Sequence, residues 1–313
     1  RVVGWWCSSD DLVAKDSSIA LVEAESPSQI RDEFEFSGLS VVCTNPQTDS
    51  YADYRCDFEL WEVDSGFMMY IGCNVTYSKF FDDGTLRTFL TYGIDRQTLV
   101  DDNYGGLALP TTLPISPMSP YYSKSLATNY DYDEMRFIDA ASKFRVPTND
   151  KGVPRTLQLL VNSDDSARLR CARNIAATLT ELGLACETVE SPTSVYEARL
   201  QAANYDIYLG ITKLPTTADL SEFYRPWGEM SWGGLANETI YNMVNQSLAD
   251  RGNYYNLHKL VADDGRIIPV MAGYYAIYAK RGVLSDLNPA RDNVFYYTLG
   301  KTMESSKVAT QFS

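Results

Sequence analysis

The stretch from Thr156 to Gly210 most restricts the fold, because it alternates between strand and helix patterns with short connections. Its apolar and amphipathic runs predict three strands and the two helices between them, at 156–161, 167–182, 184–189, 195–201 and 205–210. Strand–helix–strand units with connections this short place consecutive strands parallel in one sheet. The chain is therefore predicted to contain an α/β lobe built on a parallel sheet.

Capping signals mark both ends of the helix predicted at 167–182. The polar run from Asn162 to Ser166 offers N-cap side chains before the first turn, and Gly183 stands where a helix ends in the left-handed conformation. The apolar residues of the segment recur at helical spacing, so one face is expected to pack on the sheet.

Patterns outside this stretch predict further elements. We expect strands and helices in the following places: strands at 18–23, 39–43, 68–74 and 267–278, a helix opening at Ser26, and a single helix over 83–100 capped by Asp83. The strand at 68–74 is almost wholly apolar, which indicates burial on both faces. Four prolines from Pro110 to Pro120 predict an irregular loop laid over the surface.

Charge and length exclude several classes of function. The 313 residues carry 41 Asp and Glu against 27 Lys and Arg, a net charge of −14. Nucleic acids and acidic membrane surfaces are bound by clustered lysines and arginines, so neither is expected as a partner. The longest run that is both uncharged and largely apolar, 267–279, is too short for a helix that spans a bilayer. The length suggests two lobes.

Common catalytic and metal-binding motifs are missing from the sequence. His258 is the only histidine, so sites that need two histidines are impossible, and a structural role is expected for it. The six cysteines form no Cys-x-x-Cys pair. We expect isolated buried thiols such as Cys43, although up to three disulfides stay open. No nucleophile elbow, phosphate-binding loop or dinucleotide motif occurs, and no cofactor or metal ion is predicted.

Aromatic residues give the one positive signal of a binding surface. The 22 tyrosines outnumber the 12 phenylalanines and 5 tryptophans together. Tyrosine combines apolar area with a polar tip, which suits a wall that contacts a hydrated ligand. Tyr224, Trp227 and Trp232 concentrate in one irregular segment just after the α/β unit, where the carboxyl ends of the strands should open. Two interpretations stay open, a ligand wall and a plug that fills the core.

The order of several segments resembles a known family. An apolar strand ends at Asn74, the segment 81–96 ends in Ile-Asp-Arg, and a Gly-rich stretch at 105–110 leads to a Pro-rich loop at 114–120. This order resembles the extracellular solute-binding proteins of family 5, the oligopeptide, dipeptide and nickel receptors of ABC importers. The resemblance extends over about residues 15–295.

The resemblance implies a bilobed α/β fold of the periplasmic-binding-protein type II class, a venus flytrap. Residues 1–73 and 275–313 would form part of the first lobe and residues 74–274 the second, with hinges at Asn74 and Tyr274. The chain would begin inside the first lobe. We therefore expect a fragment that corresponds to the C-terminal part of a family member and lacks the N-terminal part of that lobe and the signal segment.

The resemblance also suggests which residues bind the ligand. Peptide-binding relatives place an aspartate soon after a Tyr-Asp strand, where it pairs with the amino terminus of the ligand, but an ungapped count reaches Pro215 here. Asp219 would take this role if the loop is shifted, and Lys213 would favour an anionic group. Stacking or enclosure is the role expected of the aromatic residues Tyr224, Trp227 and Trp232. Arg87 and Asp95 are expected on one helix face, where they would lock the helix to the sheet.

The predicted function is that of a non-catalytic receptor, the substrate-binding component of an ABC importer. Two lobes would close on a small solute, a peptide by family default, and the closed form would dock the permease. We expect a monomer outside the cytoplasm, either periplasmic or a cell-surface lipoprotein. Two alternatives stay open: a hydrolase with a carboxylate pair, which turnover would reveal, and a sensor or scaffold module with a cleft that binds nothing.

Overall fold

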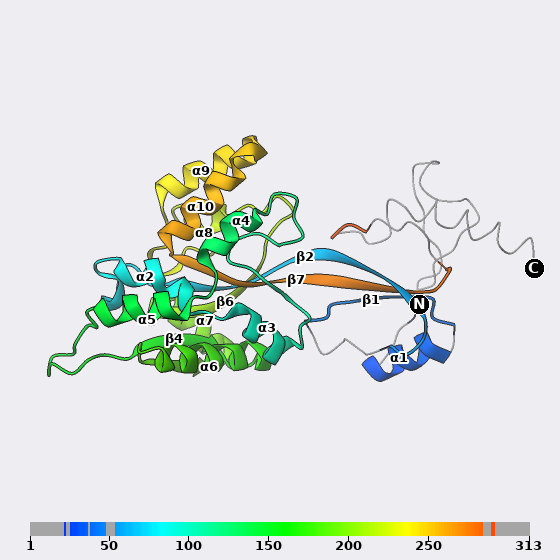
Figure 1. Ribbon diagram of the computed structural model, residues 1–313, viewed down its shortest axis with the longest axis horizontal. Coiled ribbons are helices and arrows are strands. Elements are labelled where there is room, and N and C mark those ends of the chain that lie inside the picture. The colour runs from blue at the N-terminus through cyan, green and yellow to red at the C-terminus, as the bar shows by residue number, and fades with distance from the viewer. Residues whose placement is uncertain (1–21, 23–25, 37, 48–53, 284–288, 292–313) are drawn as a thin grey trace, which may run out of the picture. The chain divides into compact units, whose positions relative to one another are not determined.

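The computed structural model describes residues 22, 26–36, 38–47, 54–283 and 289–291. The chain divides into two compact units: unit 1 comprises Arg1–Ser65 and Gly273–Ser313, and unit 2 comprises Gly66–Ala272. Strands β2 (Phe58–Cys73) and β7 (Ile267–Lys280) each continue from one unit into the other (Figure 1). The lobe boundaries expected after residues 73 and 274 stay a prediction, and the boundaries of the units fall after residues 65 and 272.

Unit 2 is built on a mixed sheet. Its strands lie in the order β7-β2-β6-β4-β5, with the short strand β3 beside β7. The bounds of the strands not yet given are β3 Leu109–Pro110, β4 Leu157–Asn162, β5 Cys186–Ser191 and β6 Ile207–Lys213. Strand β4 runs parallel to β5 and to β6, whereas β2 runs antiparallel to β6. The predicted parallel α/β sheet is therefore confirmed for β4, β5 and β6.

Helices cover both faces of this sheet. The α-helices of unit 2 are α2 Thr85–Phe89, α3 Arg96–Tyr104, α4 Lys124–Ala127, α5 Glu134–Lys143, α6 Ser166–Glu181, α7 Thr193–Gln201, α8 Ser221–Tyr224, α9 Glu238–Ala249 and α10 Tyr254–Asp264. Short 3₁₀ turns are η1 Lys79–Phe81, η2 Leu90–Gly93, η3 Thr128–Tyr130, η4 Trp232–Gly234 and η5 Arg251–Asn253. In Figure 1, α6 lies below the strands, and α9 and α10 lie above them.

Strand β2 contributes side chains to two separate cores. Met69 and Ile71 pack with one group of buried residues that includes α5 and α6, while Met68 and Tyr70 pack with another that includes α9 and α10. Successive side chains of a strand point to opposite faces, so a strand between two helix layers must be apolar throughout. The predicted burial of 68–74 on both faces is confirmed.

Two tyrosine–glycine pairs fix the register between β2 and β6. Tyr70 lies opposite Gly210 and Gly72 lies opposite Tyr208, and the two rings meet edge to face with their hydroxyl oxygens 3.3 Å apart. A Cβ on Gly72 would lie 2.2 Å from the ring of Tyr208, and one on Gly210 would lie 2.7 Å from the ring of Tyr70. Each ring therefore occupies the space above a glycine of the neighbouring strand.

The strand–helix–strand unit agrees with its predicted elements, including the caps. Asp165 accepts a hydrogen bond from the Arg168 N–H at 3.0 Å and begins α6, and Gly183 follows the helix with φ of +98°. Helix α6 packs in the core with Met69, whereas α7 packs in the core with Met68. The two helices are therefore expected on opposite faces of the sheet, because crossovers between parallel strands are right-handed and β5 and β6 flank β4 on opposite sides.

The single helix predicted at 83–100 is wrong. The segment forms α2, the turn η2 and α3, with a break at Ile94, whose backbone is extended. Gly93 packs so closely on Phe137 that a Cβ would lie 2.6 Å from its ring. Asp95 then begins α3 by accepting hydrogen bonds from the N–H of Thr98 at 3.2 Å and from its hydroxyl at 2.8 Å. A strong N-cap inside the segment restarts the helix.

The expected pairing within that helix changes accordingly. Arg87 does not share a face with Asp95, and its guanidinium instead forms an ion pair with Asp264 at 3.2 Å, just before β7. Asp83 accepts a hydrogen bond from the Thr85 N–H at 2.9 Å. The structural role expected of Arg87 is confirmed, although its partner is a different residue.

The first part of the Pro-rich segment is not a surface loop, whereas residues 117–120 are half-buried or exposed as expected. Residues 111–116 are all buried, and Thr111 donates its N–H to the carbonyl of Val270 in β7. The Thr111 hydroxyl donates to the carbonyls of Leu113 and Ile115, and the Thr112 hydroxyl donates to that of Ala127. Threonine hydroxyls thus satisfy carbonyl groups in a segment that lacks regular structure, which allows it to be buried.

The described residues of unit 1 form a helix and the outer part of the sheet. Helix α1 is Pro27–Phe36 and β1 is Val41–Thr44, which pairs antiparallel with β7. Tyr54 contacts three rings at centroid distances of 4.7 to 6.4 Å, those of Phe34, Phe58 and Tyr278. The predicted helix from Ser26 and the strand near 39–43 are confirmed, while the strand predicted at 18–23, apart from Val22, lies outside the described residues.

The cysteines follow the predicted pattern only in part. The five cysteines in the described part of the chain are free thiols, and Cys73 and Cys171 are buried as expected. The expectation that Cys43 is buried is wrong, because its side chain is exposed. It belongs to the strand β1, where Val42 and Thr44 on either side of it are buried. In a strand with one covered face, the odd and even positions have opposite environments.

Arg96 is buried in unit 2 and serves as a hydrogen-bond donor to the backbone. Its guanidinium donates to the carbonyls of Pro269 at 2.8 Å, Thr91 at 3.2 Å and Ile94 at 3.3 Å. Burial lowers the pKa of Arg96 to about 10, so it stays charged at neutral pH. The side chain therefore joins the break before α3 to strand β7.

We predict that Arg96→Met destabilises the protein by about 3 kcal/mol or more, because it leaves several buried carbonyl groups without a donor. Urea denaturation measures this as a lower free energy of unfolding. Arg145→Met serves as the control, since Arg145 is exposed and its replacement should change the unfolding free energy by less than about 0.5 kcal/mol. Equal effects of the two replacements would contradict the anchoring role of Arg96.

His258 lies in the core of unit 2, which confirms its structural role. It is 0% exposed, and neither ring nitrogen has a hydrogen-bond partner in the described part of the chain. Its ring lies 5.6 Å from that of Tyr254 in the same helix. Burial lowers the pKa of His258 to about 4, so the folded protein holds it neutral.

We predict that acid weakens the fold through His258. The unfolded chain binds a proton at this residue with pKa near 6.5 but the folded chain only near 4, so protonation favours unfolding as pH falls through this window. The unfolding free energy should fall by about 2 kcal/mol between pH 7.5 and pH 5. His258→Leu, studied by urea denaturation, should remove this slope. An unchanged slope would show that other groups cause it.

Candidate functional site

The carboxyl ends of the three parallel strands meet at one edge of the unit 2 sheet. These ends are Asn162, Ser191 and Lys213. Lys213 lies opposite Phe67 in the register of β2 and β6, and the next residue, Leu214, donates its N–H to the Gly66 carbonyl at 2.9 Å. Gly66 is the first residue of unit 2. We name this the carboxyl edge; in α/β sheets, ligands bind outside the carboxyl ends of the strands.

A polar network joins two loops of the carboxyl edge. The Asn162 amide donates to the Thr193 hydroxyl at 3.0 Å, and Thr193 donates its N–H and hydroxyl to Asp164 at 2.9 and 2.7 Å. These two donors hold the pKa of Asp164 below its usual value. The network fixes the loop after β4 against the start of α7.

Two stacked tyrosines from separate segments lie against the loop that follows β6. The rings of Tyr121 and Tyr254 lie 5.1 Å apart at an interplanar angle of 29°. The Arg251 guanidinium donates to the Tyr121 hydroxyl at 3.0 Å, and the Tyr254 hydroxyl donates to the Thr217 carbonyl in the loop after β6. The sequence analysis missed Tyr121, Arg251 and Tyr254, and the high tyrosine content was the one signal that pointed toward them.

Two of the predicted ligand residues lie in the loop that leaves this edge. Lys213 is exposed, at the end of β6. Asp219 is half-buried, and its carboxylate accepts hydrogen bonds from the Ser221 N–H at 2.8 Å and from the Ser221 hydroxyl at 2.5 Å. The edge thus carries a cation and an oriented carboxylate six residues apart, and the ligand contacts of both stay a prediction.

Trp227 is displayed on the surface by a tight turn. Its side chain is 95% exposed, and its backbone adopts φ of +61°. Glu222 holds the turn by accepting two hydrogen bonds from the Arg225 guanidinium, at 3.0 and 2.8 Å. A Cβ on Gly228 would lie 2.2 Å from the Glu222 carbonyl oxygen, so the turn requires a glycine there.

The other aromatic residues of the tract lie elsewhere. Tyr224 is 0% exposed and belongs to the core around Tyr70. Trp232 is half-buried at the far end of the sheet, where the next residue, Gly233, accepts a hydrogen bond from the Thr76 N–H at 3.2 Å. The expected position of the whole tract near the carboxyl ends is therefore wrong for Trp232. The ligand roles of these side chains stay predictions.

The two expected hinge residues occupy different positions. Asn74 lies inside unit 2, where its amide donates to the carbonyls of Ala203 at 2.9 Å and Tyr205 at 2.8 Å, before the start of β6. This is the end of the sheet opposite the carboxyl edge. Tyr274 lies two residues after the boundary at Ala272. Gly66, at the other boundary, has φ of +79° within β2. The hinge function of Asn74 and Tyr274 stays a prediction.

Four carboxyl groups in the described part of the chain are shifted toward the charged form. The pKa values of Asp164, Glu190, Glu222 and Asp263 lie below their usual range because each accepts hydrogen bonds. A general acid needs the opposite shift, so these four residues do not favour the hydrolase alternative.

The described residues show neither a metal-binding cluster nor a membrane-spanning helix. They hold no group of three or more His, Cys, Asp or Glu side chains placed to bind a metal ion. Within the same residues, no helix combines the length and the apolar character needed to cross a membrane.

Comparison with known proteins supports the resemblance seen in the sequence. A family model described as bacterial extracellular solute-binding proteins, family 5, middle region, matches residues 23–234. Among curated protein sequences, none matches this chain.

Solved structures show the same fold at low sequence identity. AppA from Clostridium difficile is 14% identical with a TM-score of 0.71, and the match covers 92% of this chain and 60% of that one. AppA from Bacillus subtilis, solved with a nonapeptide, is 15% identical with a TM-score of 0.63 and coverages of 87% and 57%. NikA from Brucella suis, solved with Fe(III)-EDTA, is 14% identical with a TM-score of 0.65 and coverages of 88% and 60%.

These likenesses confirm the predicted α/β fold of the periplasmic-binding-protein type II class. The chain spans about 60% of the length of the first of these structures.

We predict that Trp227→Asn leaves the isolated protein at least as stable as before. The indole is exposed and contributes little burial, while asparagine tolerates positive φ better than tryptophan, so a gain of up to about 1 kcal/mol is expected. Urea denaturation measures the change, with Trp232→Asn as a control that should destabilise because that ring is half-buried. A loss above about 1 kcal/mol at Trp227 would contradict the exposed position.

Proposed function

Because the chain belongs to the bacterial extracellular solute-binding proteins of family 5, we propose that it acts as the substrate-binding component of an ABC importer. The ligand class that we favour is a peptide, and the partner is the permease of the importer. The protein would work outside the cytoplasm as a monomer, either periplasmic or as a cell-surface lipoprotein.

One observation carries the proposal for the ligand. The carboxyl edge presents Lys213 and Asp219 in one loop outside the end of β6. A peptide carries an ammonium and a carboxylate group, and a site with one anion and one cation complements both. The carboxylate of Asp219 is already oriented by Ser221, which lowers the entropic cost of binding.

The surrounding side chains suit the body of a peptide. Tyr121 offers an exposed ring that is stacked on the buried ring of Tyr254, and Arg251 adds a second cation beside it. Tyrosine rings provide apolar area for varied side chains together with hydroxyls for the backbone. Burial raises the pKa of Tyr254, so its hydroxyl stays a hydrogen-bond donor at neutral pH.

The similar structures named above hold two kinds of ligand. The one from Bacillus subtilis was solved with a nonapeptide and the one from Brucella suis with a metal chelate. An Fe(III)-EDTA complex is an anion and gives no role to Asp219, whereas the amino terminus of a peptide does. This difference in charge is why we favour a peptide.

Capture between two lobes completes the proposal. We infer that residues 1–73 and 275–313 belong to one lobe and residues 74–274 to the other, with Asn74 and Tyr274 near the hinges. Ligand binding signals to a permease only if it favours the closed form over the open one. Of the three aromatic residues expected to enclose the ligand, Trp227 is the one that we propose to contact it in that form, because Tyr224 is buried in the core and Trp232 lies at the far end of the sheet.

We predict that Asp219→Asn weakens the binding of tri- to pentapeptides by about 10-fold or more, since it removes a charge-assisted hydrogen bond to the ammonium group. N-acetylated peptides lack this group, so Asp219→Asn should bind them with the same affinity as the original protein. Lys213→Gln should show the converse pattern with C-amidated peptides. Isothermal titration calorimetry measures the affinities, and thermal unfolding verifies that each variant is folded.

The matched control is Glu197→Gln on the exposed face of α7, which should bind every peptide as the original protein does. If no peptide raises the melting temperature, the peptide proposal fails, because a bound ligand stabilises the native state. If a peptide is cleaved during the titration, the receptor proposal itself fails and the hydrolase alternative replaces it.

A further inference from the structure

A hollow opens in unit 2 at the end of the sheet opposite the carboxyl edge. It has a volume of about 700 Å³ and lies between the η1 region and the loop that joins α5 to β4. Arg155 lines it two residues before Leu157, the first residue of β4. The hollow is therefore separated from the carboxyl edge by the length of the strands. Its volume falls within the range of small-molecule sites.

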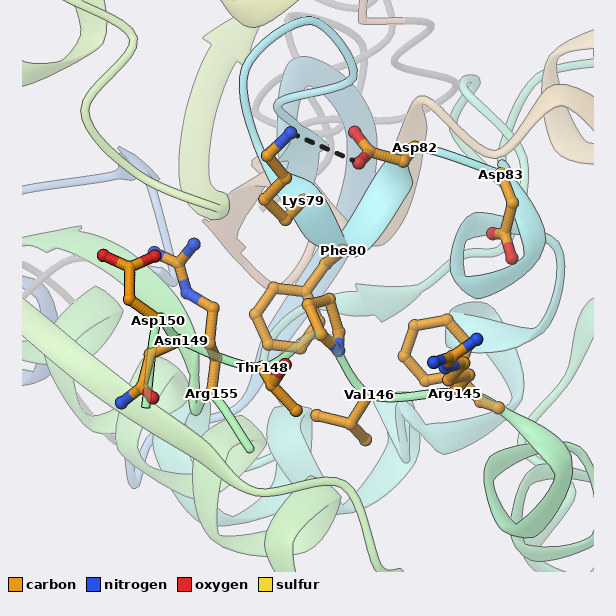
Figure 2. A pocket seen from close by; sticks show the side chains of 12 residues that line it. Lys79, Phe80, Asp82, Asp83, Arg145, Val146, Thr148, Asn149, Asp150 and Arg155 are labelled. Carbon is orange, nitrogen blue, oxygen red and sulfur yellow. Dashed lines mark ion pairs between the residues drawn. The ribbon is translucent and has the colours of Figure 1, made fainter. Parts of the chain in front are cut away.

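The floor of the hollow is apolar and its wall is ordered. Phe80 is 1% exposed and lies at the centre of the view in Figure 2, with Val146 beside it. The wall is a small hairpin in which Thr148 pairs with Pro154 and the Arg155 N–H donates to the Pro147 carbonyl at 2.8 Å. Hydrogen bonds across its base hold the charged side chains on the rim.

The rim carries equal numbers of positive and negative side chains. These are Lys79, Arg145 and Arg155, and Asp82, Asp83 and Asp150. Lys79 and Asp82 form an ion pair at 3.5 Å, and Asp83 accepts the Thr85 N–H at 2.9 Å. Within the described part of the chain, neither arginine nor Asp150 takes part in an ion pair or a side-chain hydrogen bond. Two guanidinium groups and one carboxylate therefore face the same hollow without a protein partner.

We propose that this hollow binds a small zwitterion with an apolar side chain, that is, a free amino acid or a short peptide. Arg145 would bind the carboxylate, Asp150 the ammonium, and the apolar floor formed by Val146 and Phe80 the apolar group. A guanidinium presents a fork that matches a carboxylate, and a rim of zero net charge gives no preference to ligands of one sign. Figure 2 shows Asp150 and Arg155 together on one side of Phe80 and Arg145 on the other, so a ligand over this floor would have a carboxylate at one end and the guanidinium of Arg145 at the other.

This site is independent of the peptide site proposed above. The two regions lie at opposite ends of the strands β4 and β6 and share no residue. Binding here requires no movement of unit 2 against unit 1, because every residue that lines the hollow belongs to unit 2. Occupation of the hollow would therefore persist whether or not the proposed peptide site is filled.

The test uses the dipeptide Leu-Phe and ¹⁵N–¹H correlation spectra of the 313-residue chain. Saturable shifts of the backbone amides of residues 79–83 and 144–155 are expected with the free dipeptide. N-acetyl-Leu-Phe and Leu-Phe-amide, which each lack one charge, should bind at these amides at least 10-fold more weakly. If saturating dipeptide leaves these amides unshifted, or shifts only amides at the carboxyl edge, the proposal is overturned.

Substitutions assign the roles of the charges. Asp150→Asn should weaken the binding of the dipeptide about 10-fold at these amides but leave the binding of N-acetyl-Leu-Phe unchanged. Arg145→Gln should likewise weaken the binding of the dipeptide but leave that of Leu-Phe-amide unchanged. Glu197→Gln and Arg199→Gln on α7 are the matched controls, and both should bind as the original protein does. Equal binding by the charge variants and the controls would overturn the proposal. So would equal binding of the free and blocked dipeptides.

Discussion

The pairing of β2 with β6 determines where the functional residues of unit 2 lie. Tyr70 covers Gly210 and Tyr208 covers Gly72, and a shift by one residue would place a Cβ or a second ring where each ring now lies. Such a slip would also exchange the two apolar faces of β2, which belong to different cores. The register that results sets Lys213 beside the boundary of unit 2. The carboxyl edge is thus a consequence of two packed tyrosine rings deep in the sheet.

Local patterns predicted the elements whose environment follows from their own sequence. The strands, helices and caps predicted for the segment 156–210 were correct, because each strand there is short, apolar and flanked by polar turns. The prediction of one helix at 83–100 failed because Gly93 and Asp95 interrupt it. The break depends on contacts outside the segment, namely the packing of Gly93 on Phe137 and the hydrogen bond from Arg96 to the Pro269 carbonyl. The Pro-rich loop was placed on the surface for a similar reason, since the buried hydroxyls that satisfy its backbone act through tertiary contacts.

The candidate site divides along the same line. Lys213 and Asp219 were proposed because they lie on either side of Pro215, the position that a family motif gives by its distance from a strand that the sequence reveals, and their ligand roles stay predictions. Tyr121 lies more than a hundred residues before Arg251 and Tyr254 in the sequence, and no periodicity links them. The hollow at the other end of the sheet is similar, since it forms only after a hairpin folds over a buried ring. Sequence motifs therefore give single residues, while the clusters need coordinates.

The turn at Trp227 has a consequence for optical spectroscopy. The indole of Trp227 is exposed, and an indole in water emits at long wavelength and is readily quenched by small solutes. Trp61 and Trp232, in contrast, are half-buried. The molecule thus carries its own fluorophore at a position that its backbone holds rigid through the Glu222–Arg225 pair. Any surface that covers this turn, from a permease to an antibody fragment, would shift the emission to the blue without a chemical label.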